Sequence, residues 1–465
     1  MKCYNSWQDQ RRILMKQTNS ESLSIKKKFQ LFSLSVHKNL DRLIPILFIL
    51  LATVIAFVAR YFAAKFPTND VVGFILNGWM KQIENVGFKN FYKVDADYSP
   101  LYLFIIACLT KLPKGELVNI NGYSFYLNQM YYLKSIYFLC ELLIAIGIYL
   151  IIHDVTKNRL LGVIGYCVFL FLPVQFSNSA LWGNSDTMYF LCFVYILLFV
   201  LKGKSFFAWF FFGLALSLKL QAVFIAPFLF YLMFNRKLKF YPIYASLLAL
   251  FLSFVPAYLC GASFSEPFHF FKAQVNGYSK LTLGCANLWQ LFGVYNMDKA
   301  DSPLNAASII IGLGAIFVLT AILYLRKVKL TKENIITVSV FLIGICPFFL
   351  PHMHERYFYA VDVLVLVYAL INKRRYFLIP LMQVSSGIAY YHYLTGFKKY
   401  FIDILGEDSV SFAAWINLFV LMVIFYDIMK LDHVDYHDSI DEIEEEKRKI
   451  KEGEEDISST LTNGL

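Results

Sequence analysis

Charged residues are scarce in this 465-residue chain: Asp, Glu, Lys and Arg make up only 16% of it, against about 25% in ordinary soluble proteins. Hydrophobic residues make up 58%, and the mean hydropathy is +0.54. A soluble fold does not leave so much apolar surface facing water. The composition therefore excludes disordered, nucleic-acid-binding and ordinary cytosolic proteins. It predicts an all-helical protein with many membrane spans.

Several sequence motifs are also missing. The eight cysteines include no C-x-x-C, and neither G-x-x-x-x-G-K nor G-x-G-x-x-G occurs. We therefore expect the cysteines to be small core hydrophobes, and a nucleotide donor on the cytoplasmic side has no visible binding site. We expect neither a metal nor another cofactor. Cys260 and Cys285 are both expected on the outer side, where they could pair.

Apolar runs long enough to cross a membrane recur along the chain, since a span needs about 17–25 such residues. The clear runs are 43–60, 131–152, 160–177, 241–260, 305–325, 377–393 and 412–429, and shorter ones are 187–201, 335–350 and 358–371. Polar residues interrupt the run 206–234 near Lys219, so we predict a hairpin of two short helices there. Loops rich in Lys and Arg mark the cytoplasmic side. The prediction is twelve membrane helices with both termini cytoplasmic.

The first outer segment, 61–130, is unusually long. Its part 72–92 has near-helical apolar spacing, and the run 101–112 is too short to span, so we expect both to lie in the membrane interface. The chain then has three parts. They are a basic cytoplasmic arm (1–42) without the apolar core of a signal peptide, a transmembrane domain (43–429) and an acidic cytoplasmic tail (430–465).

Under this topology, polar residues that hydropathy does not explain fall on the outer side of the membrane. They are Asp70, Asp95, Asp97, Asp186, Lys219, Gln221, Asn287, His352, His354, Glu355 and Arg356. Structural roles are open for several of them: Lys219 could form a salt bridge between helices, and Asp186 or Gln221 could cap a helix end. A metal site is not expected, because no soluble nucleotide-binding domain surrounds the D-x-D at Asp95 and Asp97. His352 and His354 are also poorly spaced as zinc ligands on one helix face.

Carboxylates beside cationic and imidazole groups, facing an outer cavity next to lipid, suit glycosyl transfer from a lipid-phosphate sugar. The acceptor hydroxyl must lose its proton as it attacks the anomeric carbon, and a nearby carboxylate can take that proton. The leaving phosphate gains negative charge, which Arg, Lys or protonated His stabilises.

At these residues the sequence resembles the integral-membrane GT-C glycosyltransferases. It is most similar to bacterial proteins like the second mannosyltransferase of GPI-anchor synthesis and, more distantly, to the lumenal glucosyltransferases of N-glycan precursor assembly. The matching pieces run in order from about residue 65 to 360. They are Asn69-Asp70 with Trp79, Asp97-Tyr98-Ser99-Pro100-Leu101, Trp182-Gly183-Asn184-Ser185-Asp186, Lys219-Leu220-Gln221, Ala286-Asn287-Leu288-Trp289 and Met353-His354-Glu355-Arg356.

The resemblance implies a polyprenyl- or dolichyl-phosphate sugar as donor and inverting transfer of a hexose, mannose among the candidates, on the outer face. It implies catalytic roles for Asp70 and Asp97, with Asp70 as the candidate general base, and a donor-phosphate site formed by His354, Arg356 and Lys219. The substrate would be bound by Trp79, Tyr98, Asp186, Gln221, Asn287, Trp289, His352 and Glu355. Relatives often have an acidic or aromatic residue after the first Asp. This chain has Val71-Val72, which leaves the choice of base between Asp70 and Asp97 open.

We therefore expect a multi-pass enzyme of a bacterial cell membrane with an extracytoplasmic active site. Its partners would be the lipid-linked donor, a lipid- or polymer-linked acceptor and membrane lipid, and not nucleic acid. The alternatives are a lipid-linked-sugar flippase or ion-coupled transporter, and a subunit without catalytic activity. Transporters usually show related halves and ionisable residues at mid-membrane depth. The halves here look unrelated and the polar set is one-sided, which favours the enzyme.

Overall fold

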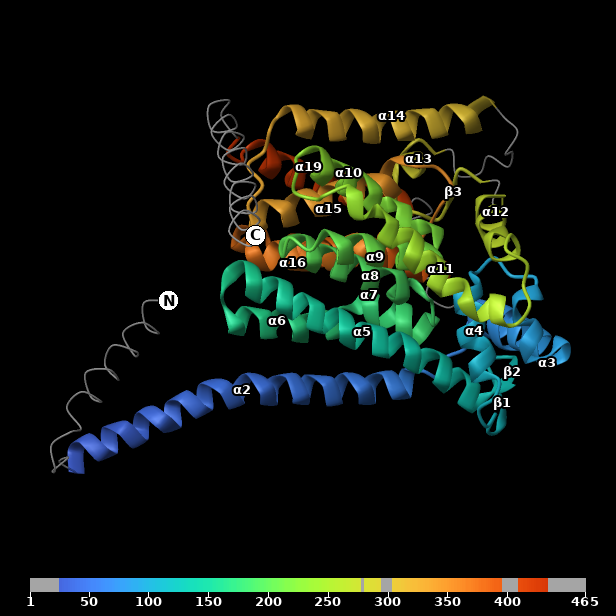
Figure 1. Ribbon diagram of the computed structural model, residues 1–465, viewed down its shortest axis with the longest axis horizontal. Coiled ribbons are helices and arrows are strands. Elements are labelled where there is room, and N and C mark those ends of the chain that lie inside the picture. Colours follow the sequence, from blue (N-terminus) through green and yellow to red (C-terminus); the bar gives the residue numbers. More distant parts are fainter. Residues whose placement is uncertain (1–24, 277–279, 294–302, 395–408, 434–465) are drawn as a thin grey trace, which may run out of the picture. The chain divides into compact units, whose positions relative to one another are not determined.

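The computed structural model describes residues 25–276, 280–293, 303–394 and 409–433 (Figure 1). The chain divides into two units, residues 1–54 and 55–465. Residues 1–24 of the predicted basic arm, with Cys3, and residues 434–465 of the predicted acidic tail lie outside the described residues.

Helices dominate the described chain. Its first half forms α2 (Ile25–Ala63), η1 (Asn69–Met80), α3 (Lys81–Val86), η2 (Phe88–Lys93), α4 (Pro100–Leu109), β1 (Leu117–Ile120), β2 (Tyr123–Tyr126), α5 (Leu127–Thr156), α6 (Arg159–Phe171), α7 (Pro173–Phe176), η3 (Ser177–Trp182), α8 (Asp186–Leu201), α9 (Ser205–Leu218), η4 (Leu220–Ile225) and α10 (Ala226–Phe234). Among these, η1 and η3 are π-helical, whereas η2 and η4 are 3-10 helices.

The second half continues in the same way. It forms η5 (Tyr241–Ile243), α11 (Tyr244–Leu259), η6 (Glu266–Phe268), α12 (His269–Asn276), β3 (Thr282–Leu283), α13 (Leu288–Leu291), α14 (Pro303–Leu325), α15 (Lys332–Phe349), β4 (Met353–His354), α16 (Tyr359–Ile371), η8 (Lys373–Arg375), α17 (Leu378–Tyr393) and α19 (Ser409–Met429). Strands β1 and β2 form an antiparallel hairpin, whose turn places Asn121 and Gly122 at positive φ.

Six described helices are long and apolar enough to cross a membrane. They are Leu43–Ala63, Leu127–Thr156, Tyr241–Leu259, Pro303–Leu325, Lys332–Phe349 and Ser409–Met429. A seventh span is possible if Arg159–Phe171 and Pro173–Trp182, which are bent by 47° at their junction, act as one. The described chain is mostly helical, with a few short strands, and its long apolar helices fit the predicted all-helical membrane protein. The count of twelve spans is not shown, because several predicted spans form helices such as α8, whose 16 residues reach only about 24 Å.

The predicted break within 206–234 is confirmed. Helix α9 ends at Leu218, and Lys219 is extended (φ −158°, ψ 139°) before the chain continues through η4 into α10. Pro227 lies in the first turn of α10, where its missing N–H has no intrahelical partner to lose. The helix is thus interrupted at the residue that carries the charge.

The apolar residues of 72–92 and 101–112 are used differently from the prediction. Val72, Leu76 and Ile83 are at most 4% exposed, and Tyr102 and Ile106 of α4 are equally buried. The apolar face that suggested an interfacial helix therefore packs inside the protein. Protein and not lipid covers this face, since the same helical spacing serves a buried helix and a lipid-facing one, and the interfacial location of these helices stays a prediction.

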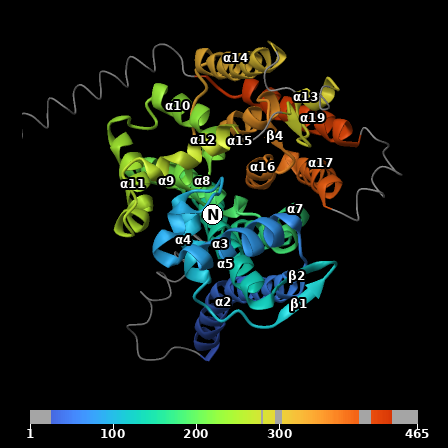
Figure 2. The same ribbon diagram turned by 90° about the vertical axis from the view of Figure 1, so that its right-hand side faces the viewer.

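The helices pack in neighbouring pairs around a buried centre. Helix α5 packs against α6 and α8, α8 against α9, and α9 against α11 (Figures 1 and 2). The α9–α11 contact is close at Gly213, where a Cβ atom would lie 2.1 Å from the Ser246 carbonyl oxygen. Helix α15 is central, with 78% of its apolar window buried, whereas α14 is peripheral, with 22% buried.

Candidate functional site

The centre of the candidate site is Asp186, the first residue of α8. The preceding η3 ends at Trp182, and Gly183 turns the chain with φ +78°, a conformation that glycine adopts without strain. Asp186 is fully buried, and its carboxylate lies at the helix N-terminus, where the helix dipole favours a negative charge. The sequence W-G-N-S-D thus folds into a turn that places an acid at the start of a buried helix.

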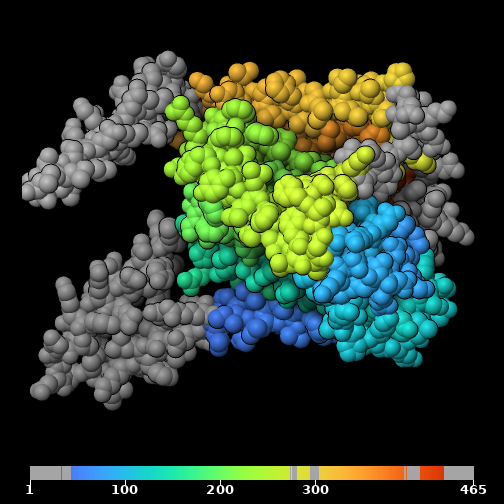
Figure 3. Space-filling view, turned by 45° about the vertical axis from the view of Figure 1, so that its right-hand side comes forward, coloured from blue at the N-terminus to red at the C-terminus, as the bar shows by residue number. Residues whose placement is uncertain are grey.

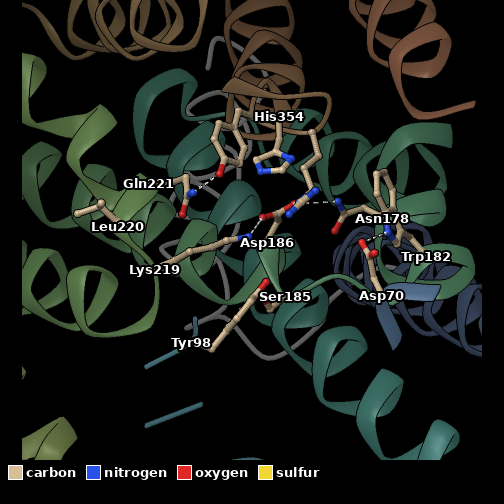
Figure 4. A network of polar contacts seen from close by, with 12 residues as sticks. Asp70, Tyr98, Asn178, Trp182, Ser185, Asp186, Lys219, Leu220, Gln221 and His354 are labelled. Atoms are coloured by element: carbon tan, nitrogen blue, oxygen red, sulfur yellow. Dashed lines mark hydrogen bonds and ion pairs between the residues drawn. The ribbon is translucent and has the colours of Figure 1, made fainter. Parts of the chain in front are cut away.

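Three cationic or amide groups converge on the Asp186 carboxylate, and Figure 4 shows two of them, Lys219 and Asn178. Lys219 Nζ donates to Oδ1 at 2.6 Å, and Asn178 Nδ2 donates to Oδ2 at 3.1 Å. Arg356 Nε lies 3.6 Å from Oδ2. Lys219 reaches the carboxylate from the break between α9 and η4. The salt bridge between helices that the sequence suggests as a structural role for Lys219 is therefore present.

The M-H-E-R segment, Met353-His354-Glu355-Arg356, supplies the remaining charged residues around Asp186. Strand β4 pairs in parallel with β3, and His352 N–H donates to the Leu281 carbonyl at 2.8 Å, so the loop that carries β3 holds the segment in place. Arg356 Nη1 donates to Glu355 Oε1 at 2.6 Å, and His354 Nδ1 lies 3.6 Å from Glu355 Oε2. We call Asp186, Lys219, His354, Glu355 and Arg356 the Asp186 cluster.

The pKa values of His354 and Glu355, the two titratable neighbours of Arg356, are both lowered. Burial and then the Arg356 charge lower the pKa of His354 below its ordinary value, so the imidazole is neutral at pH 7. Burial alone would raise the pKa of Glu355, but the Arg356 charge and the His354 contact outweigh it, and the pKa is lowered. His354 therefore acts as a neutral hydrogen-bonding group and not as the imidazolium considered from sequence.

Trp182 joins Asp70 to the Asp186 cluster. Its indole Nε1 donates to Asp70 Oδ2 at 2.8 Å (Figure 4). The Arg356 guanidinium lies over its ring, 5.5 Å from the centroid. Thr68, which precedes Asp70 by two residues, donates its hydroxyl to the Trp182 carbonyl at 2.9 Å. The half-buried acid after the first span and the guanidinium of M-H-E-R thus contact the same side chain.

Aromatic rings line the Lys219 side of the cluster. Lys219 Nζ lies 5.5 Å from the Tyr98 ring centroid and 5.9 Å from that of Tyr189. Tyr98 in turn lies 5.2 Å from the ring of Trp79, and its hydroxyl accepts from Ser185 Oγ at 3.1 Å. Of two predicted substrate-binding residues, Tyr98 is thereby next to the Asp186 cluster and Trp79 is next to Tyr98.

Asp97 and Gln221 lie at the edge of this arrangement. Gln221 Nε2 donates to the Tyr357 hydroxyl, one residue after Arg356. Gln274 of α12 donates to the Asp97 carbonyl at 2.7 Å and accepts from Leu220 N–H at 2.9 Å. In Figure 3 the yellow-green surface of this part of the chain adjoins the blue surface that includes residues near 100. The half-buried Asp97 carboxylate has no hydrogen-bond partner among the described residues.

Three predicted substrate-binding residues make other contacts. Asn287 caps α13 and donates to the carbonyls of Pro347 and Leu350 at 3.3 Å, and Trp289 Nε1 donates to the Phe349 carbonyl at 2.9 Å. The two ring nitrogens of His352 lie 2.7 Å from the Lys280 carbonyl and from Asn305 Oδ1. These contacts hold the loop before α15 and the segment after it together, which gives all three residues a structural role, and their part in substrate binding stays a prediction.

Sequence reasoning missed several buried polar residues near the site. Lys134 and Glu141 of α5 are at most 4% exposed, as is Asp362 of α16, and Arg60 donates to Glu141 at 2.7 Å. Each is an ionisable residue inside an apolar run, which is the signal that singled out Lys219. Asn178 carried no such signal, because an amide in a polar stretch is unremarkable in sequence.

Metal-ligating side chains do not gather within the described ranges: no group of three His, Cys, Asp or Glu is arranged to hold an ion. Cys260 and Cys285 are both free, and Cys285 is buried with its Sγ 3.9 Å from the Pro347 carbonyl oxygen. The suggested pairing of these two cysteines is therefore absent.

Comparison with models of known protein families gives no match for this sequence, and comparison with curated proteins gives no significant match either.

Proposed function

We propose that the protein is a membrane hexosyltransferase of the GT-C type, which moves a sugar from a polyprenyl phosphate to an extracytoplasmic acceptor. The observation that supports this most directly is the shared contact of Asp70 and Arg356 with Trp182. It brings a candidate base and a candidate phosphate-binding cation to one site, although they are far apart in sequence. The proposal includes twelve membrane helices, the short ones crossing as parts of bent or paired segments, with both termini cytoplasmic.

Asp70 is the proposed general base. As the acceptor oxygen attacks the anomeric carbon, its proton passes to the Asp70 carboxylate, and the bond from that carbon to the phosphate oxygen breaks with its electron pair going to the phosphate. The indole N–H of Trp182 holds one carboxylate oxygen at 2.8 Å and so orients the acid. Asp97 is the competing base, since its carboxylate is half-buried and has no described partner.

Arg356 is the proposed residue for the leaving phosphate. One of its terminal nitrogens binds Glu355 and its Nε lies near Asp186, which leaves further N–H groups of the same guanidinium to meet a ligand. Lys219 is less suited, because its ammonium is 2.6 Å from Asp186 and only 5% exposed. The proposal therefore assigns Lys219 to holding Asp186 in place, and His354 to binding the phosphate as a neutral donor.

Purified protein in lipid nanodiscs, incubated with a panel of polyprenyl-phosphate sugars and scored for sugar release or transfer, tests the function. Asp70→Asn should abolish turnover while leaving the protein folded, and Asp95→Asn is the matched control, since Asp95 is an exposed acid of the same outer segment. Turnover that survives Asp70→Asn and disappears in Asp97→Asn would transfer the role of base to Asp97. The absence of release from every donor by the wild-type protein would contradict the proposal.

The transporter alternative is favoured by one observation, the buried ionisable residues Lys134, Glu141 and Asp362 within α5 and α16. Transporters place such groups where both sides of the membrane can reach them in turn. If the protein is the proposed enzyme, cysteines introduced at positions 70, 219 and 354 should react with an impermeant maleimide added on the outer side and not with one added on the inner side. Labelling from both sides would favour the transporter.

A further inference from the structure

Lys134 of α5 is a buried cation whose three N–H bonds all end on main-chain carbonyls. Its Nζ donates to the carbonyls of Phe66 and Ala180 at 2.8 Å and to that of Leu181 at 3.1 Å. The residue is 4% exposed, and no described carboxylate forms an ion pair with it. Its donors are used in full, so Lys134 is not a group that awaits a ligand.

The three carbonyls belong to the two segments that carry the Asp70–Trp182 hydrogen bond. Phe66 precedes Asp70 by four residues, and Ala180 and Leu181 directly precede Trp182. Asp70 and Trp182 lie in η1 and η3, which are both π-helical. Wide turns of this kind are uncommon and occur often at functional sites.

The packing at Gly183, the residue after Trp182, is also tight. At Gly183 a Cβ atom would lie 2.8 Å from Lys134 Cε and 2.7 Å from Val71 Cγ2. The Lys134 side chain therefore fills the space between the two segments as well as binding both of them. Since a charge inside a membrane helix is costly, an apolar residue of the same length would be expected here if filling space were the only role.

We infer that Lys134 is a positioning residue for the Asp70–Trp182 pair. Its ammonium binds the main chain on both sides of that hydrogen bond, so α5 helps to set the distance from the carboxylate to the indole N–H, together with the direct contact of Thr68 with the Trp182 carbonyl. The catalytic consequence of this arrangement rests on the proposed function, whereas the geometry does not depend on it.

Fluorine NMR of protein labelled with 5-fluorotryptophan tests the geometry without any substrate. The chain has six tryptophans, and Trp182→Phe identifies the resonance of Trp182 by its disappearance. Asp70→Asn should shift that resonance, because it replaces the carboxylate that accepts from the indole. Lys134→Met should shift or broaden it as well, although residue 134 does not hydrogen bond to the ring.

Arg326→Met is the matched control. Arg326 also donates to a main-chain carbonyl, that of Met429 at 2.8 Å, and it lies near the start of α15, whose 18 residues place it about 27 Å from the end that leads to His354. It should leave the Trp182 resonance in place. If Lys134→Met does not fold, Lys134→Gln retains two N–H donors, and an intermediate shift is expected. A Trp182 resonance that moves in Asp70→Asn but stays unchanged in the folded Lys134 variant would overturn the inference.

Kinetics then separate positioning from a general loss of stability. With a donor that the wild-type protein uses, Lys134→Met should lower kcat per folded molecule at least ten-fold and leave the KM for donor within about two-fold. An unchanged kcat per folded molecule would refute the catalytic part of the inference. If no donor is turned over by the wild-type protein while the resonance still shifts, the proposed function fails and the positioning of Trp182 by Lys134 stands.

Discussion

The ion pair of Lys219 and Asp186 gives a quantitative test of the site, because the two side chains are only 5% and 0% exposed. At 2.6 Å and an effective dielectric constant of about 20, their attraction amounts to roughly 6 kcal/mol. The cost of removing both charges from water offsets much of this, and breaking a buried pair from one side typically costs about 3–5 kcal/mol.

The neighbours of the pair make the two single substitutions differ in how much free energy of unfolding they cost. Lys219→Met leaves Asp186 with Asn178 at 3.1 Å and Arg356 at 3.6 Å, so its cost should lie near the lower end of that range. Asp186→Asn leaves the buried Lys219 without any carboxylate among the described residues, so its cost should lie near the upper end. The double variant should cost less than the sum of the two by up to about 3 kcal/mol.

Reversible unfolding with SDS in mixed micelles, followed by circular dichroism, measures these free energies of unfolding. The matched control is the pair Lys114 and Glu84, which has a similar distance of 2.7 Å but exposures of 39% and 29%. Its removal should cost at most about 1 kcal/mol. A cost for Asp186→Asn that equals that of the control, or additive costs for the double variant, would refute the reasoning.

Three further outcomes follow from the structure. Gly213→Val should abolish folding, since its Cβ would lie 2.1 Å from the Ser246 carbonyl oxygen, and the yield of monodisperse protein measures this. Gly314→Ala, which has open space around it, should raise the free energy of unfolding by up to about 1 kcal/mol, and SDS titration measures this. Because the pKa of His354 is lowered, the unfolded chain binds a proton there at higher pH than the folded protein. The stability of the protein should therefore fall as the pH drops below 6.5. A melting temperature that falls just as steeply between about pH 7.5 and 5.5 in His354→Gln would contradict this. Trp289→Phe should lower stability by about 1 kcal/mol with no change in the KM for donor, and a raised KM would support the predicted part of this residue in substrate binding.

Much of the fold follows from local properties of the sequence. The apolar run 43–60 predicts a span wherever the rest of the chain lies, and the structure has an apolar helix there, Leu43–Ala63. Lys219 within 206–234 predicts the helix break that the structure contains. The start of α4 is equally local, since Ser99 caps it and Pro100 occupies its first turn. The burial of that helix was not predictable, because apolar spacing does not reveal whether lipid or protein faces it.

The sequence by itself determined which residues were too polar for their surroundings. Asp186, Lys219 and Arg356 were found because a charge beside an apolar run is costly and needs a reason. Which of these residues meet, and through what, was decided by the tertiary structure alone. Trp182 joins Asp70 to Arg356, and Lys134 joins the segments of Asp70 and Trp182, through contacts between elements far apart in sequence. Distances of this kind arise only when helices pack, so no local pattern in the chain encodes them.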